Sequence, residues 1–484
     1  MKPSKLIAEL LELLPTDCVI SEREGLRPYE CDGLTAYREI PIAVVIPTEV
    51  DEICRVMKFC MMNDIPVVAR GAGTSLSGGA KPEKNGIVLS LAKFNKILEI
   101  DAKNRIARVQ SGVRNLEISE SVEHLGLYYA PDPSSQVACT IGGNVAENAG
   151  GIHCLKYGLT VHNVLKIDVV LASGEYVSFG SGAPDAPGYD LLALLHGSEG
   201  LLGIITEITV RLLPRPPTAK AILAAFDEVT QAGEAVGAVI ANGIVPAGLE
   251  MMDNLAISAA EDFAACEYPI NAASILICEL DGTTDEVDQQ VKRVTDLFLE
   301  KGASELRVSQ SESERLRLWS GRKNAFPAIG RISPDYYCID GTIPRRQLGN
   351  VLTQIYSLSE RYGLSVANVF HAGDGNLHPL ILYDASRTDE FHRTEKLGGE
   401  ILELCIQVGG TITGEHGVGV EKLDQMCVQF SELELKQFHA LKNAFDPMGI
   451  LNRGKAIPSL ARCAELNAVH VHAGEIPFPT IERF

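Results

Sequence analysis

Short apolar runs alternate with amphipathic segments and glycine loops in the first half of the chain. The run at residues 43–46 predicts a short buried strand. A helix is then expected from Thr48, with Asp51 three residues on as its capping-box partner. The next strand, at residues 66–69, leads straight into the glycine-rich loop of residues 70–79. The pattern indicates mixed strands and helices with loops richer in glycine than connections require.

Two further apolar segments flank a tight turn and then lead to a cluster of prolines. Residues 164–171 and 175–178 lie on either side of Ala172-Ser-Gly174, which predicts a hairpin. A strand expected at residues 204–210 leads to the Leu-Pro-Arg-Pro-Pro stretch at residues 213–217. We place a domain boundary at this proline cluster.

Beyond residue 217 the pattern is typical of an α+β domain. The expected elements are a buried strand at residues 275–278, a charged helix at about 285–299, and a helix through 397–405 that ends at Gly409. A turn-rich segment at residues 446–455 closes the pattern. We therefore predict a first domain at residues 1–217, a second domain at residues 218–456 and a tail at residues 457–484.

Composition and charge argue against some classes of function. Of the 484 residues, 46% are hydrophobic and 22% are charged, which is ordinary for a globular protein, and the net charge of -20 argues against nucleic acid as a partner. No apolar run reaches the length of a membrane span, and Glu9 and Glu12 interrupt the first leucines at helical spacing, which predicts an amphipathic helix. The twelve cysteines form no C-x-x-C motif, and we expect buried thiols in a reducing, cytoplasmic compartment.

Two histidine motifs in the second half predict a metal site. Residues 371–378 read His-Ala-Gly-Asp-Gly-Asn-Leu-His between two strand-like runs, so a tight turn would bring His371 and His378 together on facing strands. Some forty residues on, Glu415 and His416 stand side by side. Two imidazoles and a carboxylate with one position left open are typical of a catalytic divalent cation, and we predict His371, His378 and Glu415 as its ligands. The alternative is a polar loop beside an unrelated Glu-His pair.

The glycine loops of the first half suit a cofactor. Residues 70–75 follow a predicted strand, where backbone N–H groups can cradle a phosphate, but Leu76 stands where the third glycine of a dinucleotide fingerprint belongs. Taken alone, this loop is as well explained by a turn without function. Residues 131–135, 140–151 and 196–203 add more glycine, serine and asparagine than connecting strands requires. Together they suit an extended cofactor with a pyrophosphate and a heteroaromatic ring.

In this order the glycine segments resemble the FAD-binding half of the vanillyl-alcohol-oxidase or p-cresol methylhydroxylase (PCMH) type of flavoprotein. The histidine motifs and residues 446–455 resemble the C-terminal half of the D-2-hydroxy-acid dehydrogenase branch, and the glycolate oxidase group of that branch is the most similar. The resemblance runs from about residue 28 to residue 455. It implies an α+β fold with a two-subdomain PCMH-type FAD-binding domain, a ferredoxin-like α+β cap domain and a short C-terminal segment that contacts FAD.

The family pattern also implies which residues hold the cofactor. They are Arg70, Gly71, Ala72, Gly73, Thr74 and Ser75 around the pyrophosphate, Pro131, Asp132, Ser134, Ser135, Thr140, Gly142, Gly143 and Asn144 along the flavin, Gly200 and Ile205 near the adenine side, and Tyr157. Some relatives attach the flavin through a histidine just after the glycines of the first loop. Thr74 stands there in this chain, so we expect FAD without a covalent link.

The reaction implied by the resemblance is oxidation of a small D-2-hydroxy acid. Flavin N5 takes the hydride, a divalent cation (zinc, manganese or iron) polarises the hydroxyl, and His416, next to a ligand, is the base. Arg322 could grip the substrate carboxylate with two parallel hydrogen bonds, with Lys323 as the weaker candidate. Asn376 could orient the substrate or a ligand. Tyr336-Tyr-Cys338 stands where D-2-hydroxyglutarate dehydrogenases carry a lysine, which favours glycolate or D-lactate.

The sequence is compatible with several partner proteins, electron acceptors and activities. The resemblance suggests a second flavin-type subunit and an iron–sulfur subunit, which could hold the chain peripherally at the inner membrane without a span of its own. A quinone or oxygen could also accept the electrons, and a homo-oligomer is open. The alternatives are a D-2-hydroxyglutarate dehydrogenase and, from another class, a hydrolase in which the metal triad activates water.

Overall fold

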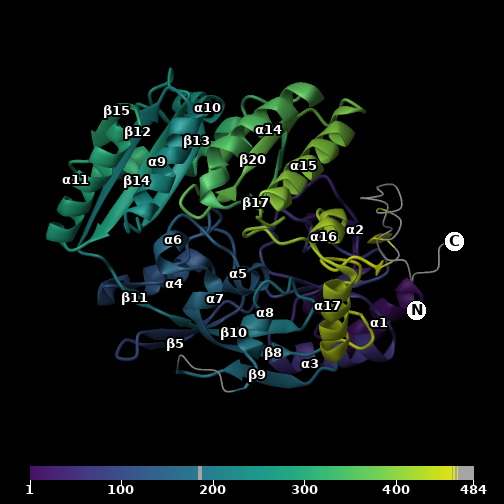
Figure 1. The fold of residues 1–484 in the computed structure, drawn as a ribbon. Coiled ribbons are helices and arrows are strands. Elements are labelled where there is room, and N and C mark those ends of the chain that lie inside the picture. The colour runs from purple at the N-terminus through teal and green to yellow at the C-terminus, as the bar shows by residue number, and fades with distance from the viewer. Residues whose placement is uncertain (184–187, 461, 464–465, 467–484) are drawn as a thin grey trace. The chain divides into compact units, whose positions relative to one another are not determined.

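The chain divides into two compact units, each assembled from separate stretches of sequence (Figure 1). The computed structural model describes residues 1–183, 188–460, 462–463 and 466. Unit 1 takes residues 1–150, 159–214 and 415 onward, and unit 2 takes residues 151–158 and 215–414. The predicted domain limits at residues 217 and 456 stay a prediction, and most of the tail predicted from residue 457 lies outside the described residues.

The first sheet of unit 1 is buried on both faces. Its order is β1-β2-β4-β3, with β1 at Val19–Ile20, β2 at Ala43–Val45, β3 at Val67–Arg70 and β4 at Ile87–Ser90; β2, β3 and β4 are parallel and β1 is antiparallel. In β2, Ala43 and Val45 join the large core under helices α1 (Pro3–Leu13) and α3 (Val50–Met62), whereas Val44 joins a smaller cluster with Leu26. Because both faces are covered, the strands appear in sequence as continuous apolar runs.

Helix α3 is present where the sequence predicts it, but the predicted cap is wrong by one residue. The N-cap is Glu49, and Glu52 accepts hydrogen bonds from the backbone N–H groups of Thr48 (2.7 Å) and Glu49 (3.2 Å). Asp51 pairs instead with Arg55, one turn along the helix. The longer side chain of Glu52 reaches back over the first turn, so the capping box uses Glu49 and Glu52 rather than Thr48 and Asp51.

The second sheet of unit 1 is antiparallel, in the order β5-β6-β10-β8-β9. Its strands are β5 (Ile97–Asp101), β6 (Ile106–Gln110), β8 (Val164–Val170), β9 (Tyr176–Gly180) and β10 (Ile204–Arg211). The predicted hairpin around residues 172–174 is confirmed as β8–β9. The remaining elements of the unit are α2 (Arg23–Leu26), α4 (Asn115–Val122), β7 (Leu127–Tyr128), α5 (Ile141–Glu147), α7 (Thr160–Asn163), α8 (Leu191–Leu195), β11 (Leu213–Pro214), α16 (Leu423–Gln429) and α17 (Glu432–Phe445).

Unit 2 is built on a seven-stranded antiparallel sheet in the order β15-β12-β14-β13-β18-β20-β16 (Figure 1). The strands are β12 (Thr218–Phe226), β13 (Gly248–Asp253), β14 (Ser274–Gly282), β15 (Ala303–Val308), β16 (Asp335–Cys338), β18 (Val366–Phe370) and β20 (Pro379–Tyr383), with β17 (Gly341–Thr342) and β19 (Asn376–Leu377) forming a small second pair. The helices are α6 (Cys154–Tyr157), α9 (Val229–Ala241), α10 (Asn254–Ala264), α11 (Thr284–Glu300), α12 (Glu312–Lys323), α13 (Ala325–Ile329), α14 (Leu348–Tyr362) and α15 (Glu390–Gln407). Helices α9 and α11 pack against β12 and β14, and α14 packs on α9. The α+β architecture expected for this half is confirmed.

The cysteines differ from the expectation in one pair. Ten of them form no disulfide among the described residues, but Cys427 of α16 forms a disulfide with Cys463. Their separation of 36 residues in sequence gives no pairing signal, so only the folded chain brings the two together. In the part of the chain that the structure describes, no helix combines the length and the apolar run needed to cross a membrane.

The packing of α11 on the sheet of unit 2 gives a stability prediction. Phe298 is fully buried and meets Phe226 of β12 edge to face, with ring centroids 6.2 Å apart. Phe298→Ala should lower the free energy of unfolding by about 3–5 kcal/mol because it removes a buried aromatic ring and leaves a cavity. Urea titration followed by circular dichroism measures the loss. Leu299→Ala, at a position that is 56% exposed, is the matched control, and equal losses in the two variants would contradict this packing.

Candidate active site

A hairpin of unit 2 brings the two predicted histidine ligands together. Strands β18 and β20 pair so that Asn368 lies opposite Pro379, and an isolated bridge joins His371 to Asn376 at the turn. The imidazoles of His371 and His378 are therefore diagonal neighbours, with ring centroids 5.0 Å apart and an interplanar angle of 83°. Both side chains are buried. The predicted hairpin and the meeting of the two imidazoles are confirmed.

A buried carboxylate that sequence reasoning missed links His371 to Arg322. Glu250 of β13 lies 2.8 Å from Nδ1 of His371 through Oε1, and its Oε2 accepts a hydrogen bond of 2.8 Å from Nε of Arg322. Burial alone would raise the pKa of Glu250, but its interactions with His371 and Arg322 outweigh the effect of burial and the pKa is lowered. The sequence signal was a single acid inside the apolar strand Gly248-Leu-Glu-Met-Met252, since a carboxylate there needs partners.

Arg322 and Lys323 differ sharply in their surroundings. Arg322 is 1% exposed, whereas Lys323, the next residue of α12, is exposed. The Nη2 atom of Arg322 lies 2.7 Å from Oε2 of Glu250 but forms no hydrogen bond within the described residues. The guanidinium is thus held at one edge by a carboxylate and keeps donors for a second acceptor. This arrangement fits the predicted grip on a substrate carboxylate at Arg322 rather than at Lys323.

A second buried carboxylate holds the peptide that leads into Glu415. Asp340 is fully buried, and its Oδ2 accepts hydrogen bonds from Oγ1 of Thr413 (2.6 Å) and from the backbone N–H of Gly414 (3.0 Å). Its Oδ1 lies 3.5 Å from Nε2 of His378. Sequence reasoning missed Asp340 as well. Because it contacts both the second histidine and the residue before Glu415, it orders two of the predicted ligand segments.

Asn376, predicted to orient substrate or a ligand, packs against the same peptide. A Cβ added at Gly414 would lie 2.5–2.6 Å from the amide group of Asn376, so a larger residue there would displace that amide. The Oδ1 atom of Asn376 is buried and has no hydrogen-bond partner among the described residues. An unused amide oxygen beside the two histidines is consistent with the predicted role.

In unit 1, the first glycine loop lies against the start of α5. Arg70 ends β3, and its Nη1 donates to the backbone carbonyl of Cys31 at 2.7 Å. A Cβ on Gly71 would clash with Oγ1 of Thr140, which caps α5 by accepting from the backbone N–H of Gly143. The predicted pyrophosphate and flavin segments are therefore adjacent, and the missing side chain of Gly71 allows this close approach. The donor set fits FAD.

The other predicted flavin segments are tied to α5 by an asparagine that was not predicted. Asn115 donates through Nδ2 to the carbonyl of Pro131 (3.0 Å) and to Oδ1 of Asn144 (3.0 Å). In the same segment as Pro131, Asp132 and Ser135 are half-buried and Ser134 is exposed. Further along the chain, Gly200 has φ of 71° and approaches Asn452, and Ile205 lies buried in β10.

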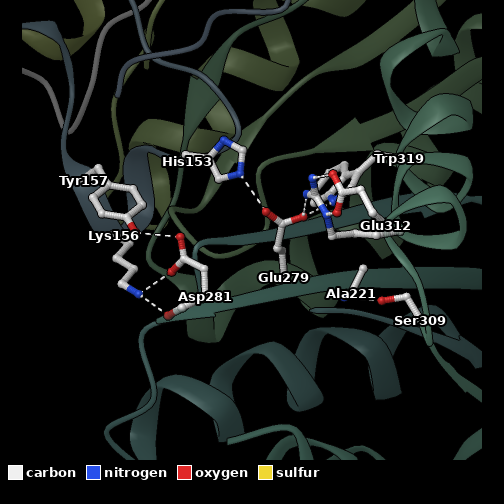
Figure 2. Close-up of polar contacts among 10 residues, drawn as sticks. His153, Lys156, Tyr157, Ala221, Glu279, Asp281, Ser309, Glu312 and Trp319 are labelled. Atoms are coloured by element: carbon white, nitrogen blue, oxygen red, sulfur yellow. Dashed lines mark hydrogen bonds and ion pairs between the residues drawn. The ribbon is translucent and has the colours of Figure 1, made fainter. Parts of the chain in front are cut away.

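Tyr157 stands apart from the other predicted cofactor residues because it belongs to unit 2 (Figure 2). Its hydroxyl donates to Oδ2 of Asp281 at 2.6 Å, and Lys156 pairs with the same carboxylate. His153, from the same segment, lies 3.2 Å from Glu279 of β14. Residues 151–158 thus follow a predicted flavin segment in sequence but are bound to the sheet of unit 2.

Glu415 and His416 lie in unit 1, next to the segment predicted to line the flavin. A Cβ on Gly150 would be 2.6 Å from Oε2 of Glu415, and Nε2 of His416 is 4.0 Å from Oε1 of the same carboxylate. Beyond His416 the backbone is held by Glu199, whose carboxylate accepts from the N–H groups of Val418 (2.6 Å) and Gly419 (2.7 Å).

Two of the buried acids in unit 1 interact electrostatically. Burial, followed by the charge of Glu199, raises the pKa of Glu147, and burial also raises the pKa of Glu199. Glu147 is bonded to Ser75 of the first glycine loop. Sequence reasoning assigned no role to this pair, although each glutamate stands in one of the glycine segments.

Comparison with known proteins agrees with these two halves. Residues 41–180 match the family "FAD binding domain", and residues 215–456 match "FAD linked oxidases, C-terminal domain". The chain is 60% identical to glycolate oxidase subunit GlcD of Escherichia coli K12 over 98% of this chain and 94% of that protein. It is 31% identical to a D-lactate dehydrogenase of Anaerostipes hadrus over 93% of this chain and 97% of that protein.

A solved structure shows the same fold at low sequence identity. The structure of p-cresol methylhydroxylase with substrate bound matches with a TM-score of 0.78 at 21% identity, covering 94% of this chain and 97% of that chain. The fold and the glycine-lined loops define an FAD-dependent oxidoreductase of the PCMH type. The chain belongs to the FAD-linked oxidase family, so the predicted resemblance is confirmed and the hydrolase alternative has no support.

The closing segment of unit 1 gives a pH prediction. Lys455 is buried, its Nζ donates to the carbonyl of Gly79 (2.9 Å) and to Oδ1 of Asn452 (3.3 Å), and burial lowers its pKa to about 7. Between about pH 7 and pH 10 the unfolded chain keeps a proton that the folded protein has lost, so this lysine makes stability rise with pH across that window.

Lys455→Met should therefore reduce the gain in apparent Tm between pH 7 and pH 9.5, measured by differential scanning fluorimetry. The exposed Lys58→Met is the control and should keep the slope of the unchanged protein. Equal slopes in both variants would show that Lys455 titrates normally.

Proposed function

We propose that the chain oxidises a small D-2-hydroxy acid, glycolate or D-lactate, to the 2-oxo acid. The relatives named as a glycolate oxidase subunit and as a D-lactate dehydrogenase support this substrate class. The observation that carries the proposal is the buried chain Arg322–Glu250–His371, which joins a cation suited to a carboxylate with an imidazole suited to a metal. A 2-hydroxy acid presents a carboxylate and a hydroxyl on neighbouring carbons.

The side chains at the proposed site are of the types that bind a divalent cation and FAD. Nδ1 of His371 faces Glu250, so Nε2 is its metal-binding atom, and His378 and Glu415 would complete a set of two imidazoles and one carboxylate. When bound, the divalent cation supplies a Lewis acid for the substrate hydroxyl, and FAD supplies the two-electron acceptor. Thr74 offers no nitrogen to the flavin, so FAD would be held without a covalent bond.

Separate residues of the chain would then bind the substrate, orient it and remove its proton. Arg322 binds the substrate carboxylate and orients the α-carbon, and Asn376 offers its buried amide to the substrate or to a ligand. His416 takes the hydroxyl proton, because it directly follows a ligand and is not itself needed as one. Asp340 and Glu199 hold the backbone on either side of this Glu-His pair.

The substrate is proposed to carry a single carboxylate. Tyr336 and Tyr337 of β16 stand where a second cation would be needed, and Phe326 packs on the ring of Tyr336 edge to face at 6.0 Å. Tyrosine carries a neutral hydroxyl and no positive charge, so a distal carboxylate would have no ion-pair partner there. D-2-hydroxyglutarate is the alternative in the same reaction class.

We also propose that this chain works as one subunit of a larger enzyme, as the E. coli relative named as a subunit does. The expected partners are a second flavin-type subunit and an iron–sulfur subunit, which would receive the electrons and could attach the chain to the inner membrane.

The substrate class is tested by mixing the FAD-loaded protein anaerobically with glycolate, D-lactate, L-lactate and D-2-hydroxyglutarate and following flavin absorbance. Glycolate or D-lactate should bleach the flavin at least about tenfold faster than D-2-hydroxyglutarate, because a second carboxylate left without a cation costs more than about 1.4 kcal/mol. Fastest reduction by D-2-hydroxyglutarate would overturn the assignment.

The base is tested with His416→Ala. The variant should keep its FAD content and lose about 10²–10⁴-fold in the rate of flavin reduction, because the hydroxyl proton has no acceptor. His392→Ala removes an exposed imidazole of α15 and should react normally. A His416 variant that reduces its flavin at the normal rate would place the base elsewhere.

A further inference from the structure

Glu250 lies in the middle strand of the sheet of unit 2 and contacts side chains from two other elements. Its strand β13 lies between β14 and β18 in the sheet order. His371 follows β18 directly, and Arg322 comes from α12. The side chains of Glu250 and both partners are at most 4% exposed. The three side chains therefore hold one another through these contacts.

The contact with Glu250 determines which nitrogen of His371 would bind a metal. Because Oε1 of Glu250 is an acceptor 2.8 Å from Nδ1, the proton belongs on Nδ1 and the lone pair on Nε2. A carboxylate behind a metal-bound imidazole fixes its tautomer and ring orientation and makes it a stronger ligand.

The same carboxylate orients the guanidinium of Arg322. Nε and Nη2 both lie within 2.8 Å of Oε2. The guanidinium edge formed by these two nitrogens therefore faces Glu250. The backbone N–H of Arg322 donates to the hydroxyl of Tyr268 at 3.2 Å, so the end of α12 is held as well. The remaining N–H groups are presented in a fixed plane, as bidentate binding of a carboxylate requires.

We propose that Glu250 is a positioning residue that couples metal binding at His371 to carboxylate recognition at Arg322. This inference rests on the proposed function and deepens it. His371, the proposed metal ligand, and Arg322, the proposed carboxylate-binding residue, contact the two oxygens of the same side chain. The distance between His371 and Arg322 is therefore fixed. A substrate whose hydroxyl and carboxylate are on neighbouring carbons can then engage both. Substitution of Glu250 disturbs the two functions together, whereas substitution of an independent residue would disturb one.

Glu279 offers a matched control on the neighbouring strand (Figure 2). It faces Gly248 across the β13–β14 pairing, is 3% exposed, and accepts hydrogen bonds from Nη1 of Arg315 (2.6 Å) and Nε1 of Trp319 (2.5 Å). Like Glu250 it is a buried glutamate bound to an arginine of α12. The same Glu→Gln change therefore removes a similar charge without touching the predicted site.

The test compares Glu250→Gln with Glu279→Gln in the full-length, FAD-loaded protein. Zn²⁺ affinity is measured by competition with a chromophoric chelator, alongside FAD content, apparent Tm, and the KM and kcat for glycolate and D-lactate. Glu250→Gln should bind Zn²⁺ about 10–100-fold more weakly and show a raised KM at unchanged FAD content. Glu279→Gln should keep the affinity of the unchanged protein.

Arg322→Lys is the second variant, and it keeps the charge beside Glu250. Lysine lacks the planar edge that Arg322 places against Oε2 of Glu250, so Zn²⁺ affinity should fall several-fold in the absence of substrate even though Arg322 is no ligand. Normal Zn²⁺ affinity in either Arg322→Lys or Glu250→Gln would overturn the coupling. If the unchanged protein binds no Zn²⁺, Mn²⁺ or Fe²⁺ and turns over in excess chelator, the proposed metal site fails instead. These outcomes separate the two claims.

Discussion

A carboxylate withdrawn from water inside a β-sheet is stable only when cationic groups or hydrogen-bond donors surround it, and this constraint organises unit 2. Glu250 lies between the apolar residues Leu249 and Met251 of β13, and its two oxygens contact an imidazole and a guanidinium. Each of those partners comes from a different element of the fold. The position of the strand therefore fixes the position of both chemical groups, and the candidate active site follows from satisfying one buried charge.

The peptide that carries Glu415 and His416 obeys the same rule. Before it, Asp340 accepts from Thr413 and Gly414, and after it, Glu199 accepts from Val418 and Gly419. Short glycine-containing peptides cost much conformational entropy to order. Hydrogen bonds that the peptide donates to these buried carboxylates oppose that cost at both ends. Asp340 thus orders the peptide before the Glu-His pair within unit 2, and Glu199 orders the peptide after it within unit 1.

Local patterns predicted what depends on local chemistry. The turn at residues 373–376 and the apolar runs beside it were enough to predict the hairpin and the meeting of His371 with His378. The flavoprotein fold was predicted from the resemblance of the ordered glycine segments to a known family, not from local chemistry. The cap of α3 differs from the prediction because Glu49 and Glu52, rather than Thr48 and Asp51, form the capping box. That error came from a local choice between equally available side chains.

Long-range partners could not be predicted in the same way. Glu250 and Asp340 are 121 and 38 residues from the histidines that they contact, and only the strand order brings them there. Residues 151–158 continue a glycine segment of unit 1, yet Tyr157 and Lys156 bind Asp281 of unit 2. An isolated acid in an apolar strand signals that a partner exists, but it does not identify the partner.

X-ray absorption spectroscopy of the protein loaded with one equivalent of Zn²⁺ tests the central claim most directly. The account predicts a shell of nitrogen and oxygen at about 2.0–2.2 Å with the multiple-scattering signature of two imidazoles. A shell of oxygen alone, or one that contains sulfur, would contradict it, because the cation would then be bound away from His371 and His378.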